Sequence, residues 1–138
     1  MVTAYDVNPT VLIERAAVKL REAGIKEPDW VKFVKSGSHT ERIPEKKDFW
    51  YVRCASLLRQ AYTENVVGVN RLRSHYGGRK KRGVRPGKRR RAGGSIIRKG
   101  LQELEKAGFI SKEKVGRKIT KKGVAFLDGI AKEMKAVK

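Results

Sequence analysis

Apolar residues in the first third of the chain recur three and four positions apart, the spacing that gives an α-helix one apolar face. The residues on this face are Leu12, Ile13, Ala16, Ala17 and Leu20. Asn8 and Pro9 suit the N-cap and the first helical position, and Gly24 suits the end of a helix. The pattern predicts a first helix that starts at Pro9. A shorter helix is expected from Pro28, followed by a loop over residues 37–47.

The widest amphipathic pattern covers residues 49–63, which we expect to follow an N-cap at Asp48. Two adjacent apolar rows would together cover about half of this helix. One row is Trp50, Cys54, Leu57 and Ala61, and the other is Tyr51, Ala55, Leu58 and Tyr62. Such a helix is expected at the centre of the fold, with its aromatic residues in the core. Arg53 and Arg59 fall at opposite margins of the polar stripe that remains.

The middle of the chain has a much weaker apolar pattern. Val69, Leu72 and Tyr76 recur at helical spacing and predict a short, partly buried helix that ends at Gly77. Residues 79–94 have no apolar periodicity and are rich in glycine and arginine. This composition predicts a long surface loop that is mobile until a partner orders it.

The last third predicts a helix, a small β-hairpin and a closing helix. Ser95 suits the N-cap of a helix that reaches Ala107. Residues 109–119 are too short for another helix and predict a hairpin around Gly116, after which Thr120 caps the final helix. This order predicts a mainly α fold, a winged-helix-like bundle around the central amphipathic helix with the hairpin as its wing. Residues 1–138 are expected to form one domain with a basic loop insertion at about 77–94.

Charge changes the picture most between Asn65 and Gln102, where there is no Asp or Glu. The formal net charge of the whole chain is +20. Thirteen cations fall within this acid-free segment: Arg71, Arg73, Arg79, Lys80, Lys81, Arg82, Arg85, Lys88, Arg89, Arg90, Arg91, Arg98 and Lys99. Lys and Arg at this density predict a polyanionic partner, and nucleic acid is the leading candidate.

The two nucleic acids make different demands on this sequence. A DNA-binding regulator would place the helix from Ser95 in the major groove, with Arg98, Lys99 and Gln102 toward base edges. The long basic insertion before that helix would crowd the groove. Irregular RNA is recognised by shape, phosphates and unstacked bases, so RNA accommodates a basic loop more easily. RNA is therefore preferred, with the DNA-binding regulator as the alternative.

Each candidate residue also has a simpler interpretation. Arg53 and Arg59 could be solvated or paired with carboxylates on a neighbouring helix. Arg117 and Lys118 of the hairpin could serve solubility alone. Tyr76 suits burial and base stacking equally well.

The sequence contains no recognisable catalytic or metal-binding motif. His39 and His75 have no thiol or carboxylate at ligand spacing, so we expect no metal and no cofactor. Cys54 is a single cysteine on the apolar face, which indicates a reducing compartment and a poor nucleophile. No apolar run is long enough to span a membrane. We expect a cytoplasmic protein without enzymatic activity.

The chain resembles the small-subunit ribosomal protein family S19e of archaea and eukaryotes. The resemblance covers nearly the whole chain. It is carried by Trp30-Val31-Lys32, Trp50-Tyr51-x-Arg53-x-Ala55-Ser56-x-x-Arg59-x-x-Tyr62, Gly68-Val69, Tyr76-Gly77-Gly78-Arg79, Gly94-Ser95, Leu101-Gln102-x-Leu104-Glu105 and Gly116-Arg117-Lys118-x-Thr120. Cys54 stands where the family usually has alanine.

This resemblance implies a helical, winged-helix-like protein that binds ribosomal RNA in the head of the small subunit and supports its maturation. It implies neighbouring ribosomal proteins as further partners, with no catalysis and no cofactor. The free protein is expected to be a monomer. Arg53, Arg59 and the turn formed by Tyr76, Gly77, Gly78 and Arg79 would lie at the RNA surface. The heavy charge and the lack of a eukaryote-like extension suggest an archaeal source.

Overall fold

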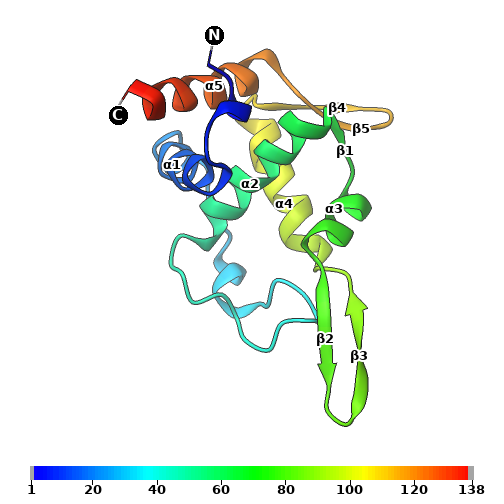
Figure 1. Cartoon of the computed structure of the whole chain (residues 1–138). Coiled ribbons are helices and arrows are strands. Elements are labelled where there is room, and N and C mark those ends of the chain that lie inside the picture. Colours follow the sequence, from blue (N-terminus) through cyan, green and yellow to red (C-terminus); the bar gives the residue numbers. More distant parts are fainter. Residues whose placement is uncertain (1, 137–138) are drawn as a thin grey trace.

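The computed structural model describes residues 2–136 and shows a mainly helical protein with small antiparallel sheets (Figure 1). The α-helices in this range are α1 (Pro9–Glu22), α2 (Phe49–Glu64), α3 (Val69–Tyr76), α4 (Gly94–Lys106) and α5 (Lys121–Ala136). The strands are β1 (Val66–Val67), β2 (Gly78–Arg82), β3 (Arg85–Arg90), β4 (Ile110–Glu113) and β5 (Gly116–Ile119). Short 3₁₀ helices cover Ala4–Asp6 and Asp29–Phe33. The mainly helical prediction is confirmed.

Helix α2 lies at the centre of the fold, as its two apolar rows predict. It packs against α1, α4 and α5 (Figure 1). All four residues of its first apolar row, from Trp50 to Ala61, are fully buried. Tyr51 and Tyr62 are half-buried beside them and pack on the same core. Tyr62 also donates a hydrogen bond to Asp128 of α5 at 2.8 Å, so its polar end is satisfied.

The helix ends follow the predicted caps only in part. The Asn8 side chain accepts a hydrogen bond from the Thr10 amide at 2.9 Å, and Thr120 accepts one from the Gly123 amide at 3.3 Å. Asp48 precedes α2, but its side chain makes no capping hydrogen bond. The predicted N-cap at Ser95 is wrong by two residues, because α4 begins at Gly94 and its N-cap is Gly93.

The predicted hairpin is confirmed as β4 and β5, and β1 adds a third strand to it. The strand order is β1-β5-β4, with Val66 opposite Lys118 and Val67 opposite Arg117. Asn65 ends α2 with a φ of 67°, which turns the chain out of the helix and into β1. A two-residue strand has too little alternation to be recognised in a sequence.

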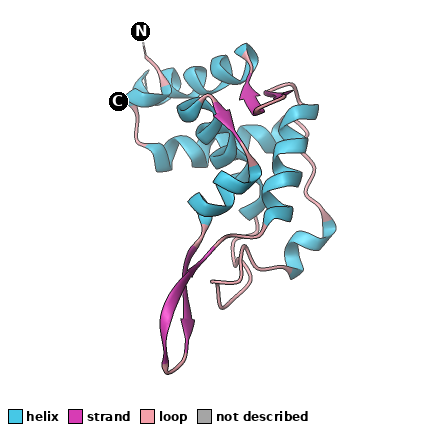
Figure 2. Cartoon of the chain, turned by 90° about the vertical axis from the view of Figure 1, so that its right-hand side faces the viewer, coloured by secondary structure: helices cyan, strands magenta, loops and turns pink. Residues whose placement is uncertain are grey.

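The predicted loop over residues 79–94 is wrong for most of its length, because residues 78–90 form an antiparallel hairpin that we name the arm. Arg82 and Arg85 are opposite each other across the two-residue turn Gly83–Val84. Gly83 has a φ of +68° at the first turn position, where glycine carries no steric cost. Pro86 and Gly87 together oppose Lys81, a bulge that accommodates a proline without a ladder amide. The arm projects away from the helices (Figures 1 and 2).

Candidate nucleic-acid interface

The base of the arm is fixed to the body by hydrogen bonds to α3 and to the segment around Ser36. The backbone carbonyl of Arg73 in α3 accepts a hydrogen bond from the Ala92 amide at 2.9 Å, and the Arg73 side chain donates one to the Ala92 carbonyl at 2.9 Å. Ala92 also pairs with Gly37 in an isolated β-bridge, and the next amide, that of Gly93, donates to the Ser36 carbonyl at 2.8 Å. These contacts hold the residues that follow β3 between α3 and the segment after the second 3₁₀ helix.

Gly77, which precedes the arm, and Gly78, its first residue, both lie where a Cβ atom would be too close to its neighbours. A Cβ atom on Gly77 would overlap the Arg90 carbonyl across the hairpin. A Cβ atom on Gly78 would lie 2.8 Å from Cδ2 of His39, which is too close for an unstrained contact. Arg89 then donates from its guanidinium to the Ser74 carbonyl of α3. The predicted Tyr76-Gly77-Gly78-Arg79 turn is therefore the closely packed connection between α3 and the arm.

The arm carries eight cations and no acidic residue in its thirteen positions. Its cross-strand pairs place like charges directly opposite each other, an arrangement that destabilises a sheet. These pairs are Arg79 with Arg89, Lys80 with Lys88 and Arg82 with Arg85. An isolated two-stranded hairpin is marginally stable even without such repulsion. The structure thus concentrates positive charge where no acidic side chain of residues 2–136 forms an ion pair with it.

The remaining cations of the acid-free segment lie on either side of the arm. Arg71 of α3 and Arg98 and Lys99 of α4 are all exposed, as is Arg91. Ion pairs in residues 2–136 involve only cations outside the segment, and they are Lys19–Glu133, Arg42–Glu45, Lys106–Glu103 and Arg117–Glu105. Residues 65–102 therefore present unneutralised charge from α3 through the arm to the start of α4.

Arg53 is less exposed than the sequence pattern predicts. Its guanidinium carbon lies 4.1 Å from the centre of the Tyr76 ring and 5.2 Å from that of Phe49. Burial lowers the pKa of Arg53, with the nearby Tyr76 opposing the shift, but an arginine remains charged at physiological pH. The Tyr76 hydroxyl and the Ser56 hydroxyl share a hydrogen bond of 2.6 Å. Arg53 and Tyr76 therefore join α2 to α3.

Arg59 lies half-buried on the same polar stripe of α2, without an ion pair in the described residues. Gln60 beside it forms a hydrogen bond of 3.1 Å with His75 of α3. The ring of His75 in turn contacts Tyr76 edge-on, at 4.9 Å between centroids. These polar neighbours extend the surface from α2 onto α3. The sequence does not single them out, because their proximity arises from helix packing.

The two candidate residues of the β4–β5 hairpin differ in their surroundings. Arg117 has 16% of its side chain exposed and its Nε lies 3.6 Å from a carboxylate oxygen of Glu105. Lys118 is exposed. Figures 1 and 2 place this hairpin and the arm at opposite ends of the molecule. The structure therefore places the cations of residues 65–102 in one part of the molecule. Arg117 and Lys118 lie at the opposite end.

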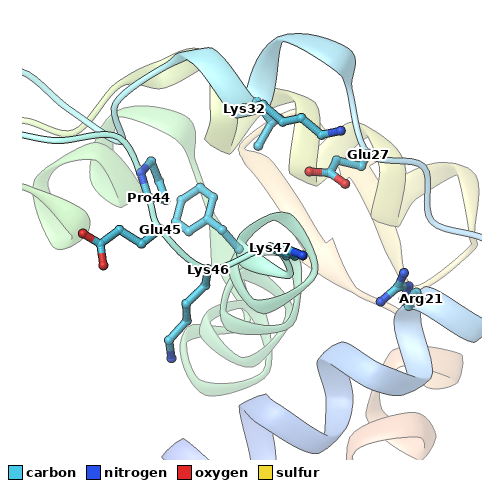
Figure 3. Close-up of a pocket in the computed structure, with 9 residues that line it drawn as sticks. Arg21, Glu27, Lys32, Pro44, Glu45, Lys46 and Lys47 are labelled. Atoms are coloured by element: carbon cyan, nitrogen blue, oxygen red, sulfur yellow. The ribbon is translucent and has the colours of Figure 1, made fainter.

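A hollow near the start of α2 differs from the arm because acidic residues are among those that line it (Figure 3). Its volume is about 540 Å³, and its lining combines basic side chains such as Lys32 and Lys46 with the acidic Glu27 and Glu45. Lys32 and Glu27 extend toward each other in Figure 3. Such mixed charge does not favour a polyanion.

Fold and charge together define a small, basic, mainly helical protein whose positive charge is concentrated on and around one projecting hairpin. None of the helices in residues 2–136 is both long and apolar enough to cross a bilayer. The sequence pattern of the family described as ribosomal protein S19e matches residues 3–137. The chain belongs to the ribosomal protein S19e family. The resemblance seen in the sequence is thereby confirmed, and so is the prediction that this is a non-enzymatic protein.

Similar proteins match over nearly their whole length. The small ribosomal subunit protein eS19 of Aeropyrum pernix is 45% identical over 138 residues, covering 97% of this chain and 90% of the relative. The protein of the same name from Haloarcula marismortui is 44% identical, with 97% and 92% covered. The small ribosomal subunit protein eS19B of Schizosaccharomyces pombe is 40% identical, with 94% and 92% covered.

Proposed function

We propose that this chain is a structural component of the small ribosomal subunit and that it binds ribosomal RNA through the arm and the helices at its base. The arm is the observation that carries the proposal. It projects from the body, bears eight cations and has no acidic residue of its own. Phosphate groups of RNA are the ligands that would relieve its internal repulsion. Family membership and the names of the relatives support the same assignment.

The finer parts of the proposal depend on the family resemblance. The site is ribosomal RNA in the head of the small subunit, the protein supports maturation of that subunit, and other ribosomal proteins contact it there. The chain acts as one RNA-binding domain over residues 1–138 and is a monomer when free. A winged-helix arrangement is supported by the order α2, β1, α3, α4, β4 and β5, in which β1 joins the hairpin sheet.

The candidate residues divide by their surroundings into two proposed roles. Exposed cations that form no ion pair within the described part of the chain are proposed to contact phosphates, and they include Arg71, Arg79, Lys81, Arg85, Lys88, Arg90, Arg91, Arg98, Lys99 and Lys118. Arg59 and Lys80 join them although they are half-buried. Residues already held by the protein are proposed to position the others, and they are Arg53, Arg73, Tyr76, Gly77, Gly78, Arg82, Arg89 and Arg117.

The salt dependence of RNA binding tests the arm directly. Replacing Lys81, Arg85 and Lys88 with glutamine removes three exposed arm cations. If each contacts a phosphate, the slope of log K against log salt should fall in magnitude by roughly 2 to 3, because each contact contributes about 0.7 to 0.9. The matched control replaces Arg15, Lys26 and Lys132, which are also exposed but lie outside the acid-free segment. An equal effect of both triple variants would refute the arm as the binding surface.

Association with the subunit tests the wider proposal. The protein should cosediment with purified small subunits at near-unit stoichiometry, and Arg59→Glu should fold but incorporate poorly. The DNA-binding alternative predicts instead a dimer that binds duplex DNA of defined sequence, with roughly 1 to 3 kcal/mol lost per mismatched base pair. Absence from subunits together with such DNA binding would overturn the ribosomal assignment.

A further inference from the structure

A second hollow lies at the base of the arm, between α4 and the segment that follows the second 3₁₀ helix. Its volume is about 470 Å³, within the range of small-ligand sites. One wall carries Trp30, Val34 and Lys35, and the other carries Ile96, Arg98 and Lys99. The hydrogen bond from Gly93 to Ser36 and the bridge between Gly37 and Ala92 tie the two walls together. The hollow is therefore built by the same contacts that fix the arm.

The lining of this hollow combines an apolar interior with a cationic rim. Trp30 is half-buried and stands edge-on to the buried Trp50, with 6.4 Å between ring centroids, which fixes its orientation. Lys35, Arg98 and Lys99 are exposed and form no ion pair in residues 2–136. No acidic residue lines the hollow, unlike the one in Figure 3.

We propose that this hollow binds one unpaired nucleotide of the RNA that the arm contacts. The base would pack against Trp30 and the neighbouring aliphatic side chains, and its phosphates would lie among Lys35, Arg98 and Lys99. An unpaired base offers the flat apolar surface that suits an aromatic wall, whereas a paired base inside a duplex does not. The inference rests on the proposed function, because the arm supplies most of the electrostatic attraction and the hollow adds a preference among RNAs.

The test compares two RNAs, a blunt duplex and the same duplex with one unpaired 2-aminopurine at its centre. The protein should bind the bulged duplex about tenfold more tightly at equal salt, the size expected for stacking of one base on an aromatic residue. Stacking should also quench 2-aminopurine fluorescence. Trp30→Leu should abolish both the preference and the quenching. Phe33→Leu is the matched control, because Phe33 is 80% exposed on the same 3₁₀ helix and does not line the hollow.

A second pair of variants keeps the test valid if Trp30→Leu does not fold. Replacing Lys35 and Arg98 with glutamine should reduce the preference for the bulged duplex. Replacing Lys81 and Arg85 on the arm should weaken binding of both RNAs by the same factor and leave the preference intact. Equal binding of both RNAs by the unmodified protein would overturn this inference and leave the proposed function standing. Binding of neither RNA would overturn both, and loss of the preference in the arm variant alone would show that the hollow is not the site.

Discussion

Reversing one charge on the arm should stabilise the free hairpin while weakening its binding to RNA. Lys80 and Lys88 are the suitable pair, because they lie directly opposite each other and neither donates a side-chain hydrogen bond to the backbone. In the other two pairs, Arg82 donates to the Pro86 carbonyl and Arg89 to the Ser74 carbonyl. Replacing Lys88 with glutamate turns a repulsive pair into an attractive one and leaves those hydrogen bonds in place.

The size of the effect follows from the spacing of opposed side chains. Cβ atoms of such a pair are about 5 Å apart, so the charges can be taken as about 6 Å apart. In water they interact by about 0.7 kcal/mol, and the change from repulsion to attraction is therefore about 1.4 kcal/mol. This free energy corresponds to about tenfold slower hydrogen exchange of the β2 and β3 amides at low salt. The difference should largely vanish near 1 M salt, where the Debye length is about 3 Å.

Hydrogen exchange of the arm amides, followed by mass spectrometry at several salt concentrations, measures this directly. In the unmodified protein, added salt should slow exchange in the arm because it screens the cross-strand repulsion. Lys118→Glu is the control, since Lys118 lies opposite Ser111 and Val66 rather than a cation. RNA affinity should fall for Lys88→Glu although its free arm is better ordered. If amide exchange in the arm is the same in Lys88→Glu as in the unmodified protein, or does not change with salt, like-charge repulsion does not limit the order of the hairpin.

Three further predictions concern the helical body of the protein. Gly100→Ala should destabilise the fold by about 1 to 3 kcal/mol in urea unfolding, because its Cβ would lie 2.6 Å from Leu57, whereas Gly129→Ala has open space and should stabilise α5 by up to about 1 kcal/mol. Arg53→Gln should lower stability by about 1 kcal/mol through loss of the contact with the Tyr76 ring, measured in the same way. Burial raises the pKa of Tyr76, so its contribution to stability is present below about pH 10 and declines as pH rises through the raised value; Tyr76→Phe should reduce this alkaline decline in unfolding free energy.

The buried framework could be predicted from the sequence because it depends on one-face periodicity. The apolar rows of α2 identified the central helix, and its first row is fully buried as expected. The arm could not be predicted in the same way. Neither of its faces is packed against a core, so strands β2 and β3 show no apolar alternation. The only feature typical of a hairpin was the two-residue turn Gly83–Val84, which begins with glycine. It did not identify the hairpin because the residues on both sides are cations rather than alternating apolar residues.

The candidate interface was predicted by composition but not in its internal organisation. Charge counting identified the acid-free segment, because electrostatic attraction to a polyanion depends on local charge density rather than on fold. Contacts between elements distant in the sequence decide which cations already bind a protein side chain. Arg53 on the Tyr76 ring and Arg117 beside Glu105 are such contacts. Lys35 lies on the rim of the hollow, next to Ser36, whose carbonyl accepts a hydrogen bond from the distant Gly93 amide, and nothing in the local sequence indicates this contact.

The distribution of acidic residues explains why the position of the charge matters more than its total. All 14 acidic residues lie outside residues 65–102, and that segment carries +13 of the net +20. At the other end of the molecule, Lys19 of α1 pairs with Glu133 of α5 at 2.7 Å. The arm and the adjoining parts of α3 and α4 therefore offer a polyanion a surface of one sign, and attraction over about one Debye length would orient the protein before any specific contact forms. Two variants with the same net charge should for this reason bind RNA differently, the arm triple variant weakly and the control triple variant almost normally.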